Sequence, residues 1–342
     1  MKNIYLLTDY KNYFSSKYLS VPYRSGMNKD LLSKYFSELG YDVHFLNYSE
    51  IDFRNEVYKD KIFLYSSSED INGYYKDYIE DILLGLNLCG AKIVPEFKYF
   101  RAHNNKVFME ILRDISNIND IKNIKSKYLG TFEDALNVIN DKNDSFVIKT
   151  SAGSTSLGVY KSNNEKEFKQ IIKKVSSVKN LYYDLWDKIR AIRRKGYVKE
   201  SQHRKKFIVQ NLVKGLQNDW KVLIFGNKYY VLYRKVRDND FRASGSGKFE
   251  YKDDLPNGFL DYCEKIFNYF QVPKIGIDVA FDGKEFFLFE FQAIYFGTHT
   301  LDTSPYYYIR ENGNWVIKYE TSIVEKEYAN SIIAYLNKQL SD

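Results

Sequence analysis

The segment from Ile275 to Gln292 most restricts the folds open to this chain, because apolar residues recur in it at every second position. Such a period of two predicts two β-strands that share one apolar face. With an odd-length turn at residues 282–284, Asp278, Glu290 and Gln292 would lie together on the opposite face. The residues expected on the apolar face are Ile275, Ile277, Val279, Phe281, Phe287, Phe289 and Phe291.

The polar face of this hairpin is a candidate metal site. Carboxylates and an amide beside an apolar sheet lose hydration unless a cation compensates them. Oxygen ligands of this kind suit Mg²⁺ that is shared with substrate phosphates. We therefore interpret Asp278, Glu290 and Gln292 as metal ligands. The alternative is a half-exposed hairpin with scattered polar residues.

A second candidate site follows the apolar segment 146–149, which we expect to be a strand that ends in Lys149. Small residues allow consecutive backbone N–H groups to approach a phosphate, and a lysine beside them adds positive charge. The segment has neither the Walker A pattern nor GxGxxG. The alternative is an ordinary hairpin with a turn rich in glycine and serine. The turn contains Gly153, Ser154, Thr155, Ser156 and Gly158.

Three arginines, Arg234, Arg237 and Arg242, precede a Ser/Gly segment at 244–247. Arginines that lead into such a loop are suited to binding phosphate or carboxylate groups. An isolated arginine pair on a strand is more often a surface feature than a binding site, so both interpretations remain open.

The order of expected elements indicates an α/β protein of three units. Residues 1–100 alternate strands and helices, which predicts a small parallel sheet. A second unit over 101–206 begins with an amphipathic helix at 106–115. The third unit, 207–342, holds the metal hairpin and a closing helix at 322–338, and its other expected strands are 207–213, 220–225 and 228–236.

Composition excludes several classes of protein. The 342 residues are 44% hydrophobic and 28% charged, as in ordinary globular proteins. No apolar run approaches the roughly 18–20 residues that span a bilayer, and the amino terminus does not resemble a signal peptide. Cys89 and Cys263 lack metal-ligand spacing. We expect a cytoplasmic protein, and a net charge of +7 suits anionic ligands without predicting nucleic-acid binding.

The stretch 187–206 is unusually basic, with nine Lys or Arg residues against Asp187 and Glu200. One interpretation is a solvated basic helix inserted into the second unit. The other is a docking face for an anionic partner, substrate or membrane surface.

In this order, the motifs resemble those of the ATP-grasp superfamily, which includes D-alanine–D-alanine ligase and glutathione synthetase; the likeness extends over about residues 100–300. The resemblance implies an α/β fold with two grasp lobes behind a small βα domain, and Mg-ATP bound between the lobes. It implies that Lys106 and Lys149 bind nucleotide phosphates under the loop 153–158. Since both lysines would lack an anion without ATP, their replacement should not reduce stability. The resemblance also implies that a segment holds adenine, largely through its backbone, and that Asp219 contributes to nucleotide binding. The residues of the adenine segment would be Gln210, Asn211, Leu212 and Val213.

The same resemblance assigns two Mg²⁺ ions, replaceable by Mn²⁺, to Asp278, Glu290 and Gln292, and places Arg234 and Arg242 with Lys149 as catalytic residues. The chain departs from the family pattern where Gln292 replaces the usual asparagine and Lys221 replaces a frequent arginine. Gln210 and Asn211 also stand where an acidic residue is usual. These departures indicate a distant or specialised member.

The reaction that the resemblance implies is ADP-forming ligation of a carboxylate to an amine through an acylphosphate. The carboxylate would belong to a small molecule, a saccharide or a peptide, and no nucleic-acid partner is expected. A phosphotransferase and a non-catalytic nucleotide-binding protein are the alternatives. His299 is a candidate substrate contact, although a hydrogen-bonded loop histidine explains it as well. The oligomeric state stays open, with a dimer as one option.

Overall fold

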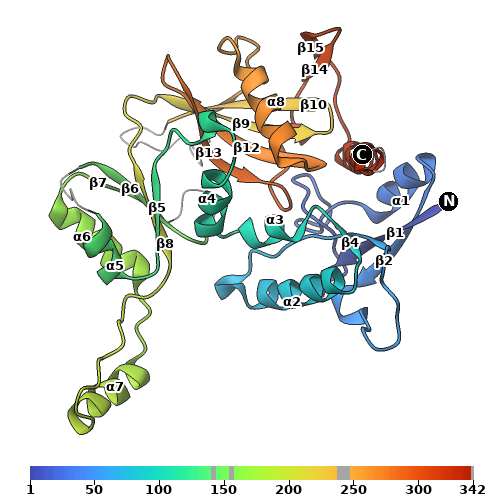
Figure 1. Ribbon diagram of the computed structural model, residues 1–342. Coiled ribbons are helices and arrows are strands. Elements are labelled where there is room, and N and C mark those ends of the chain that lie inside the picture. The colour runs from blue at the N-terminus through green and yellow to red at the C-terminus, as the bar shows by residue number, and fades with distance from the viewer. Residues whose placement is uncertain (140–143, 154–157, 237–246, 340–342) are drawn as a thin grey trace. The chain divides into compact units, whose positions relative to one another are not determined.

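The computed structural model describes residues 1–139, 144–153, 158–236 and 247–339. The chain divides into two compact units, one made of residues 1–103 and 216–342 and the other of residues 104–215 (Figure 1). Both units combine helices with β-sheets, as the sequence predicts. Among the described residues, no helix is both long and apolar enough to cross a bilayer.

The first part of the larger unit is the predicted parallel α/β unit. Its sheet has the order β2-β1-β3-β4, and all of its pairings are parallel. Asn28 caps the first helix by accepting from the N–H groups of Asp30 and Leu31. The elements are β1 (Lys2–Thr8), α1 (Lys29–Glu38), β2 (Tyr41–Asn47), β3 (Ile62–Leu64), α2 (Tyr74–Leu88), β4 (Lys92–Val94) and α3 (Phe97–Ala102), with short 3₁₀ turns at Tyr48–Glu50 and Ile71–Gly73.

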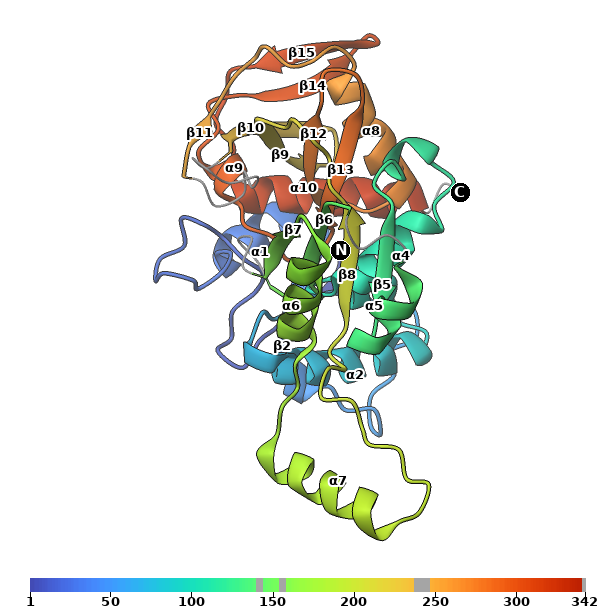
Figure 2. The same cartoon turned by 90° about the vertical axis from the view of Figure 1, so that its left-hand side faces the viewer.

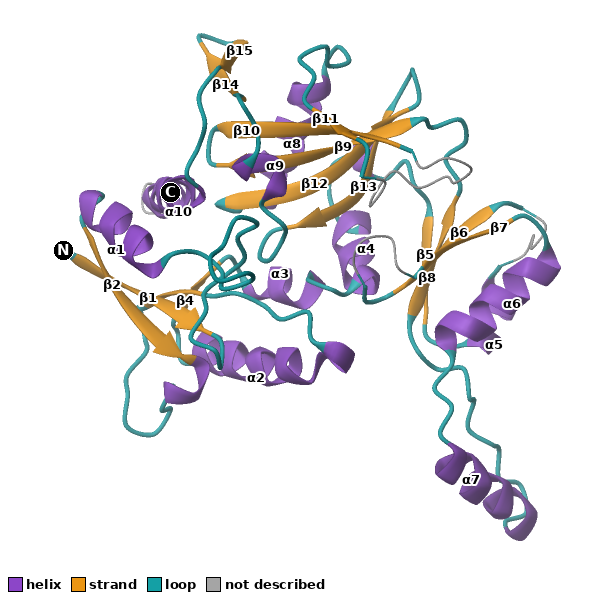
Figure 3. Ribbon diagram, turned by 180° about the vertical axis from the view of Figure 1, so that it is seen from behind, coloured by secondary structure: helices purple, strands orange, loops and turns teal. Residues whose placement is uncertain are grey.

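The second part of the larger unit is an antiparallel sheet in the order β13-β12-β9-β10-β14-β15, with β11 paired to β10. Figure 3 shows this sheet from behind, with α8 beside it. The elements are β9 (Asn218–Phe225), β10 (Lys228–Lys235), β11 (Phe249–Glu250), α8 (Phe259–Phe270), β12 (Lys274–Phe281), β13 (Phe286–Gln292), α9 (His299–Asp302), β14 (Tyr307–Glu311), β15 (Asn314–Lys318) and α10 (Val324–Gln339).

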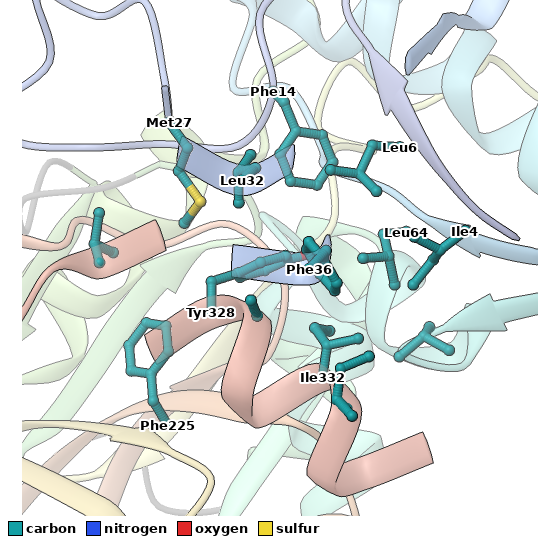
Figure 4. Close-up of a cluster of buried hydrophobic side chains, with 14 of the residues drawn as sticks. Ile4, Leu6, Phe14, Met27, Leu32, Phe36, Leu64, Phe225, Tyr328 and Ile332 are labelled. Atoms are coloured by element: carbon teal, nitrogen blue, oxygen red, sulfur yellow. The ribbon is translucent and has the colours of Figure 1, made fainter. Parts of the chain in front are cut away.

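One hydrophobic core joins these two parts (Figure 4). Helix α10 contributes Tyr328 and Ile332, which pack with Leu32 and Phe36 of α1 and with Phe225 of β9. The fully buried Glu325 of α10 adds polar bonds, because it accepts from Lys17 Nζ at 2.8 Å and from the N–H of Asn28 at 2.8 Å. Residues that the sequence assigns to a first and a third unit therefore form a single folded body.

The smaller unit has an antiparallel sheet in the order β5-β8-β6-β7. Leu129, Ile148, Phe168, Ile172 and Phe207 belong to its core. The elements are α4 (Lys106–Asp114), a 3₁₀ turn (Asn119–Ile121), β5 (Ser126–Leu129), α5 (Phe132–Val138), β6 (Phe146–Thr150), β7 (Val159–Ser162), α6 (Glu165–Ser176), α7 (Leu181–Arg193) and β8 (Phe207–Asn211).

Strand β8 corrects the predicted boundary between residues 206 and 207. The prediction placed this strand at the start of the C-terminal unit, whereas it pairs with β5 and β6 and buries Phe207 and Val209 in their core. The chain leaves the smaller unit only after Gly215. Order along the sequence does not show which sheet a short apolar strand joins, since any sheet with an open edge can accept it.

The hairpin of β12 and β13 differs from the predicted one in its turn. Phe281 lies opposite Phe286, so the connection 282–285 has four residues rather than an odd number. A β-bulge between Asp278 and Val279 shifts the register by one residue. An even loop and a one-residue bulge together keep Asp278, Glu290 and Gln292 on one face, as predicted, and they place Asp278 opposite Glu290. Two phenylalanines therefore leave the predicted apolar face, because Phe287 lies opposite Ala280 and Phe289 lies at the bulge, where it is half-buried. Leu288, opposite Val279, takes their place on that face.

Candidate functional site

A row of charged residues crosses four strands of the larger unit. Asp278 on β12 lies between Lys221 on β9 and Glu290 on β13, because each is its direct cross-strand partner. Arg234 on β10 is the cross-strand partner of Asp219, which shares a strand face with Lys221. Register alone therefore brings these five side chains, from residues far apart in sequence, to one face of the sheet.

Arg234 joins the two aspartates of this row. Its Nε and Nη2 atoms donate to the carboxylate of Asp219 at 2.6 and 2.8 Å, and Nη2 also lies 3.0 Å from Asp278 Oδ2. Lys221 Nζ lies 2.8 Å from the other oxygen, Asp278 Oδ1. Arg234, Asp219 and Asp278 have side chains no more than 13% exposed, so these ion pairs are weakly screened by water.

These cations decide the charge of Asp278. Burial by itself would raise the pKa of this carboxyl, but Arg234 and Lys221 outweigh burial and hold the pKa below its ordinary value. Asp278 is therefore ionised at neutral pH and can offer oxygen ligands. Arg234, which the sequence suggested as a phosphate-binding residue, instead orients two carboxylates in this structure.

Glu290 and Gln292 complete the polar face of the hairpin. Gln292 Nε2 donates to Glu290 Oε1 at 2.9 Å, which leaves the amide oxygen of Gln292 available to a cation. Both side chains are half-buried. Two carboxylates and an amide oxygen on one face fit the oxygen ligands that Mg²⁺ prefers. Within the described ranges, no group of three His, Cys, Asp or Glu residues is arranged to hold a metal, so the Gln292 amide would complete the set.

In the smaller unit, the start of α4 holds the beginning of the Gly/Ser loop. Lys106 Nζ donates to the carbonyl of Gly153 at 2.6 Å, and its backbone N–H donates to the carbonyl of Ser151 at 2.8 Å. Asn104 Oδ1 accepts from the N–H of Gly153 at 2.8 Å, and Asn105 Oδ1 accepts from Ser151 Oγ at 3.1 Å. Lys106 therefore has a protein partner without any nucleotide.

The end of the same loop requires glycine. Gly158 has φ +82°, and a Cβ there would lie 2.2 Å from Thr150 Oγ1. Its carbonyl accepts from the N–H of Thr150, which closes the hairpin of β6 and β7. Lys149 is half-buried near the end of β6, where its Cα lies opposite Val159 and Ile208. Ser154, Thr155 and Ser156 of the predicted loop, with Arg237 and Arg242, lie outside the described residues.

Replacing Lys106 with methionine should destabilise the protein even without nucleotide, contrary to the expectation from sequence. The Gly153 carbonyl would lose its charged donor, which costs about 1–3 kcal/mol. Urea unfolding should show this loss, and hydrogen exchange of the amides at 151–153 should become faster. The exposed Lys127 of the same unit provides the control. If Lys106→Met is as stable as Lys127→Met, the bond to Gly153 contributes nothing.

The segment predicted to hold adenine begins at the end of β8. The buried Gln210 donates through Nε2 to Ser126 Oγ at 2.9 Å, and Ser126 Oγ donates to Glu110 Oε2 at 2.6 Å. The N–H of Asn211 donates to the carbonyl of Lys125, while the N–H of Leu212 lies 3.4 Å from the carbonyl of Ser145. Adenine recognition would therefore rest on the other backbone groups of this segment, which continues to Val213.

Sequence reasoning missed one buried group, the pair of Glu110 and Arg113 on α4. Both side chains are fully buried, and Glu110 connects through Ser126 to Gln210. The i,i+3 spacing of opposite charges was the available signal, although exposed helices carry the same spacing.

His299, a candidate substrate contact, stacks edge-on against Tyr18 with a centroid distance of 4.6 Å, and burial lowers its pKa.

Comparison with known proteins gives relatives in structure only. No protein-family description and no curated protein sequence matches the chain. Among solved structures, it is similar to a Chryseobacterium gregarium RiPP-associated ATP-grasp ligase in complex with ADP and a leader and core peptide, with a TM-score of 0.54 and 13% identity over 99% of this chain and 97% of that one. It is also similar to the D-cycloserine synthetase DcsG, with a TM-score of 0.53 and 10% identity over 98% and 99% of the two chains.

A third similar structure is the D-alanine–D-alanine ligase of Bacillus anthracis, with a TM-score of 0.50 and 11% identity over 100% of this chain and 98% of that one. The chain has the ATP-grasp fold. The ATP-grasp resemblance inferred from sequence is thereby confirmed at the level of fold. The identities are too low to carry over any substrate or residue role, so the site residues named above stay predictions.

Proposed function

We propose that this ATP-grasp protein is an ADP-forming ligase that joins a carboxylate to an amine. The observation that carries the proposal is the row of charged residues on the sheet of the larger unit. In this row, the ionised carboxylate of Asp278, which is paired with Arg234, lies beside the carboxylate of Glu290 on one sheet face. Such a face suits a nucleoside triphosphate with its divalent cation. Structural likeness to ligases supports the same class of reaction.

The residues of the larger unit would hold the metal. Glu290 and Asp278 would provide carboxylate oxygens, and Gln292 its amide oxygen. Arg234 and Lys221 keep Asp278 ionised and fix its orientation, so that the site is formed before the ligand arrives. When bound, Mg²⁺ would neutralise charge on the triphosphate and align its terminal phosphate.

The residues of the smaller unit would bind phosphate oxygens. Lys149 would supply a cation, and the N–H groups of the loop that starts at Gly153 would supply hydrogen bonds. In the reaction, a substrate carboxylate oxygen attacks the γ-phosphorus and ADP leaves. The amine then attacks the acyl carbon and inorganic phosphate leaves, so ATP is consumed once for each amide formed.

Of the three kinds of carboxylate substrate expected from the sequence, we favour a small molecule or a peptide over a saccharide. One of the similar structures is in complex with a leader and core peptide, and another is a D-cycloserine synthetase. The test is an ADP-release assay with matched panels of amino acids and carboxyl-rich peptides, each with and without an amine, followed by mass spectrometry. A product lighter than its two substrates by one water supports a ligase. A product heavier by one phosphoryl group supports a phosphotransferase instead.

Lys149→Met should weaken ATP binding by about 1–3 kcal/mol, the cost of one charge-assisted hydrogen bond. Calorimetric titration of a non-hydrolysable analogue of ATP measures the loss directly. Lys161→Met on the neighbouring strand β7 is the matched control, because it removes a lysine from the same sheet. Equal affinities in Lys149→Met and in wild type would exclude a phosphate contact by Lys149.

A further inference from the structure

Helix α7 stands apart from the body of the smaller unit. Figure 2 shows it at the end of two extended chain segments, away from the sheet of β5 to β8. None of its residues is buried. We call residues 178–206, which include α7 and the two segments, the arm. Two hydrogen bonds hold the base of the arm together: the N–H of Val178 donates to the carbonyl of Gln202 and the N–H of Lys205 donates to the carbonyl of Ser176, both at 3.0 Å. Helix α7 is therefore exposed to solvent, while the two chain segments that carry it are held together where they leave the smaller unit.

The exposed helix is amphipathic, which a solvated helix does not need to be. At 3.6 residues per turn, six of its eight apolar residues fall within about 140° of the helix circumference, in a stripe that only Arg193 interrupts. Leu181 is 89% exposed and Ile192 85% exposed, and even the indole of Trp186 remains 42% exposed. An apolar stripe that its own fold does not cover indicates a binding surface. The stripe consists of Leu181, Tyr182, Leu185, Trp186, Ile189 and Ile192.

The charges of α7 are sorted around this stripe. On the helical wheel, Lys188 borders one edge of the stripe and Arg190 the other, while Arg193 lies within it beside Trp186. Asp184 and Asp187 lie on the far side of the helix. The carboxylate of Asp187 accepts from Tyr197 OH at 2.6 Å and from the N–H of Glu200 at 3.0 Å, so the returning chain occupies the acidic side. The accessible side of the helix is therefore apolar at its centre and cationic at its edges.

The arm also holds the whole net charge of the protein. Residues 178–206 contain ten Lys or Arg and three Asp or Glu, a net charge of +7. The complete chain has 51 basic and 44 acidic residues, so the remaining 41 of each sign balance. A neutral body with a strongly cationic arm would be drawn by that arm toward an anionic surface.

We propose that α7 docks this protein on an anionic lipid surface. The helix would lie in the plane of the membrane, with its apolar stripe among the upper acyl chains and its edge cations beside lipid phosphates. A convex stripe bordered by cations on both edges matches a flat anionic surface with an apolar interior, whereas an acidic polypeptide would have to supply its own groove. The proposal does not depend on the ligase activity.

The test is flotation of the full chain with vesicles of phosphatidylcholine alone and with vesicles containing phosphatidylglycerol, without nucleotide. We expect binding only to the anionic vesicles, with a loss of at least about tenfold when salt is raised from about 0.1 to about 0.5 M. Trp186 fluorescence should shift to the blue and be quenched by brominated lipid, and Trp186→Phe should remove that signal.

Two pairs of substitutions separate insertion from general charge attraction. Leu185→Ser with Ile192→Ser keeps the charge at +7 and should reduce binding at least about tenfold, because the apolar stripe is lost. Ile71→Ser with Val57→Ser, at exposed apolar positions of the larger unit, should bind as wild type does. Arg190→Gln with Arg193→Gln should also weaken binding, in contrast to Lys11→Gln with Lys284→Gln.

Circular dichroism establishes that each variant is folded before it is compared. Binding that survives Leu185→Ser with Ile192→Ser, or that is equal on neutral and anionic vesicles, overturns the proposal. Binding of the protein to polyglutamate but not to vesicles also overturns the proposal. So does self-association through the stripe, detected by sedimentation velocity, if the self-associated protein no longer binds vesicles.

Discussion

Glu290→Ala should reduce ATP turnover at least about a hundredfold while the protein remains folded. A carboxylate that holds the catalytic metal contributes several kcal/mol to charge stabilisation in the transition state, and alanine provides no substitute ligand. Glu290 is half-buried and accepts a hydrogen bond from the nearby Gln292, so its removal should cost the fold little. ATP turnover is measured by ADP release with the acceptor found in the panel assay.

The matched control is Glu285→Ala, which removes an exposed glutamate from the loop of the same hairpin. It should retain nearly full turnover. Raising Mg²⁺ or Mn²⁺ should partly restore a Glu290→Asp variant but not Glu290→Ala, because a shorter carboxylate weakens binding without abolishing it. Turnover of Glu290→Ala within a factor of a few of wild type would remove the metal site from this face of the sheet.

Arg234→Met should reduce the free energy of unfolding by about 3–5 kcal/mol, the usual cost of removing one partner from a buried ion pair. Arg234 is the shared cation of Asp219 and Asp278, and all three side chains are buried or nearly so. Without it, Lys221 is left to compensate Asp278, and Asp219 loses its bidentate partner. Urea unfolding monitored by circular dichroism measures the difference.

The neighbouring Lys235 gives the control, since its pair with Glu250 is exposed and should be worth less than about 1 kcal/mol. Adding Asp219→Asn to Arg234→Met should recover part of the loss, because one uncompensated charge disappears. An Arg234→Met variant as stable as Lys235→Met would mean that the pair is not formed in solution.

Stability of the Arg234→Met variant should depend on pH in a defined direction. In wild type, Arg234 and Lys221 lower the pKa of Asp278, so its contribution is present at neutral pH and is lost only in acid below the ordinary carboxyl pKa of about 4. In the variant, Asp219 and Asp278 stay buried but lose Arg234, so the pKa values of both carboxyl groups should rise. The folded state of the variant then binds protons at a higher pH than the unfolded state does. The stability difference should therefore shrink as the pH falls from about 7 toward about 4.

Local sequence pattern determined many of the strands and helices of this protein and the face that Asp278 and Glu290 share. The period of two in residues 275–292 predicted strands with Asp278 and Glu290 on one side, and the register confirms that shared side. It did not determine the turn, because an odd loop and an even loop with a bulge both place Asp278 and Glu290 on the same face. The order of motifs was also sufficient to predict the ATP-grasp fold.

Tertiary structure alone decided which residues are partners. Arg234 considered in isolation is an exposed anion binder, but cross-strand register places it against Asp219 and Asp278. Lys106 was expected to lack a partner until ATP binds, yet the fold brings the carbonyl of Gly153 to its ammonium group. A sequence pattern specifies the face on which a side chain lies. The groups that meet it there come from strands and loops distant in sequence, and only the folded chain brings them together.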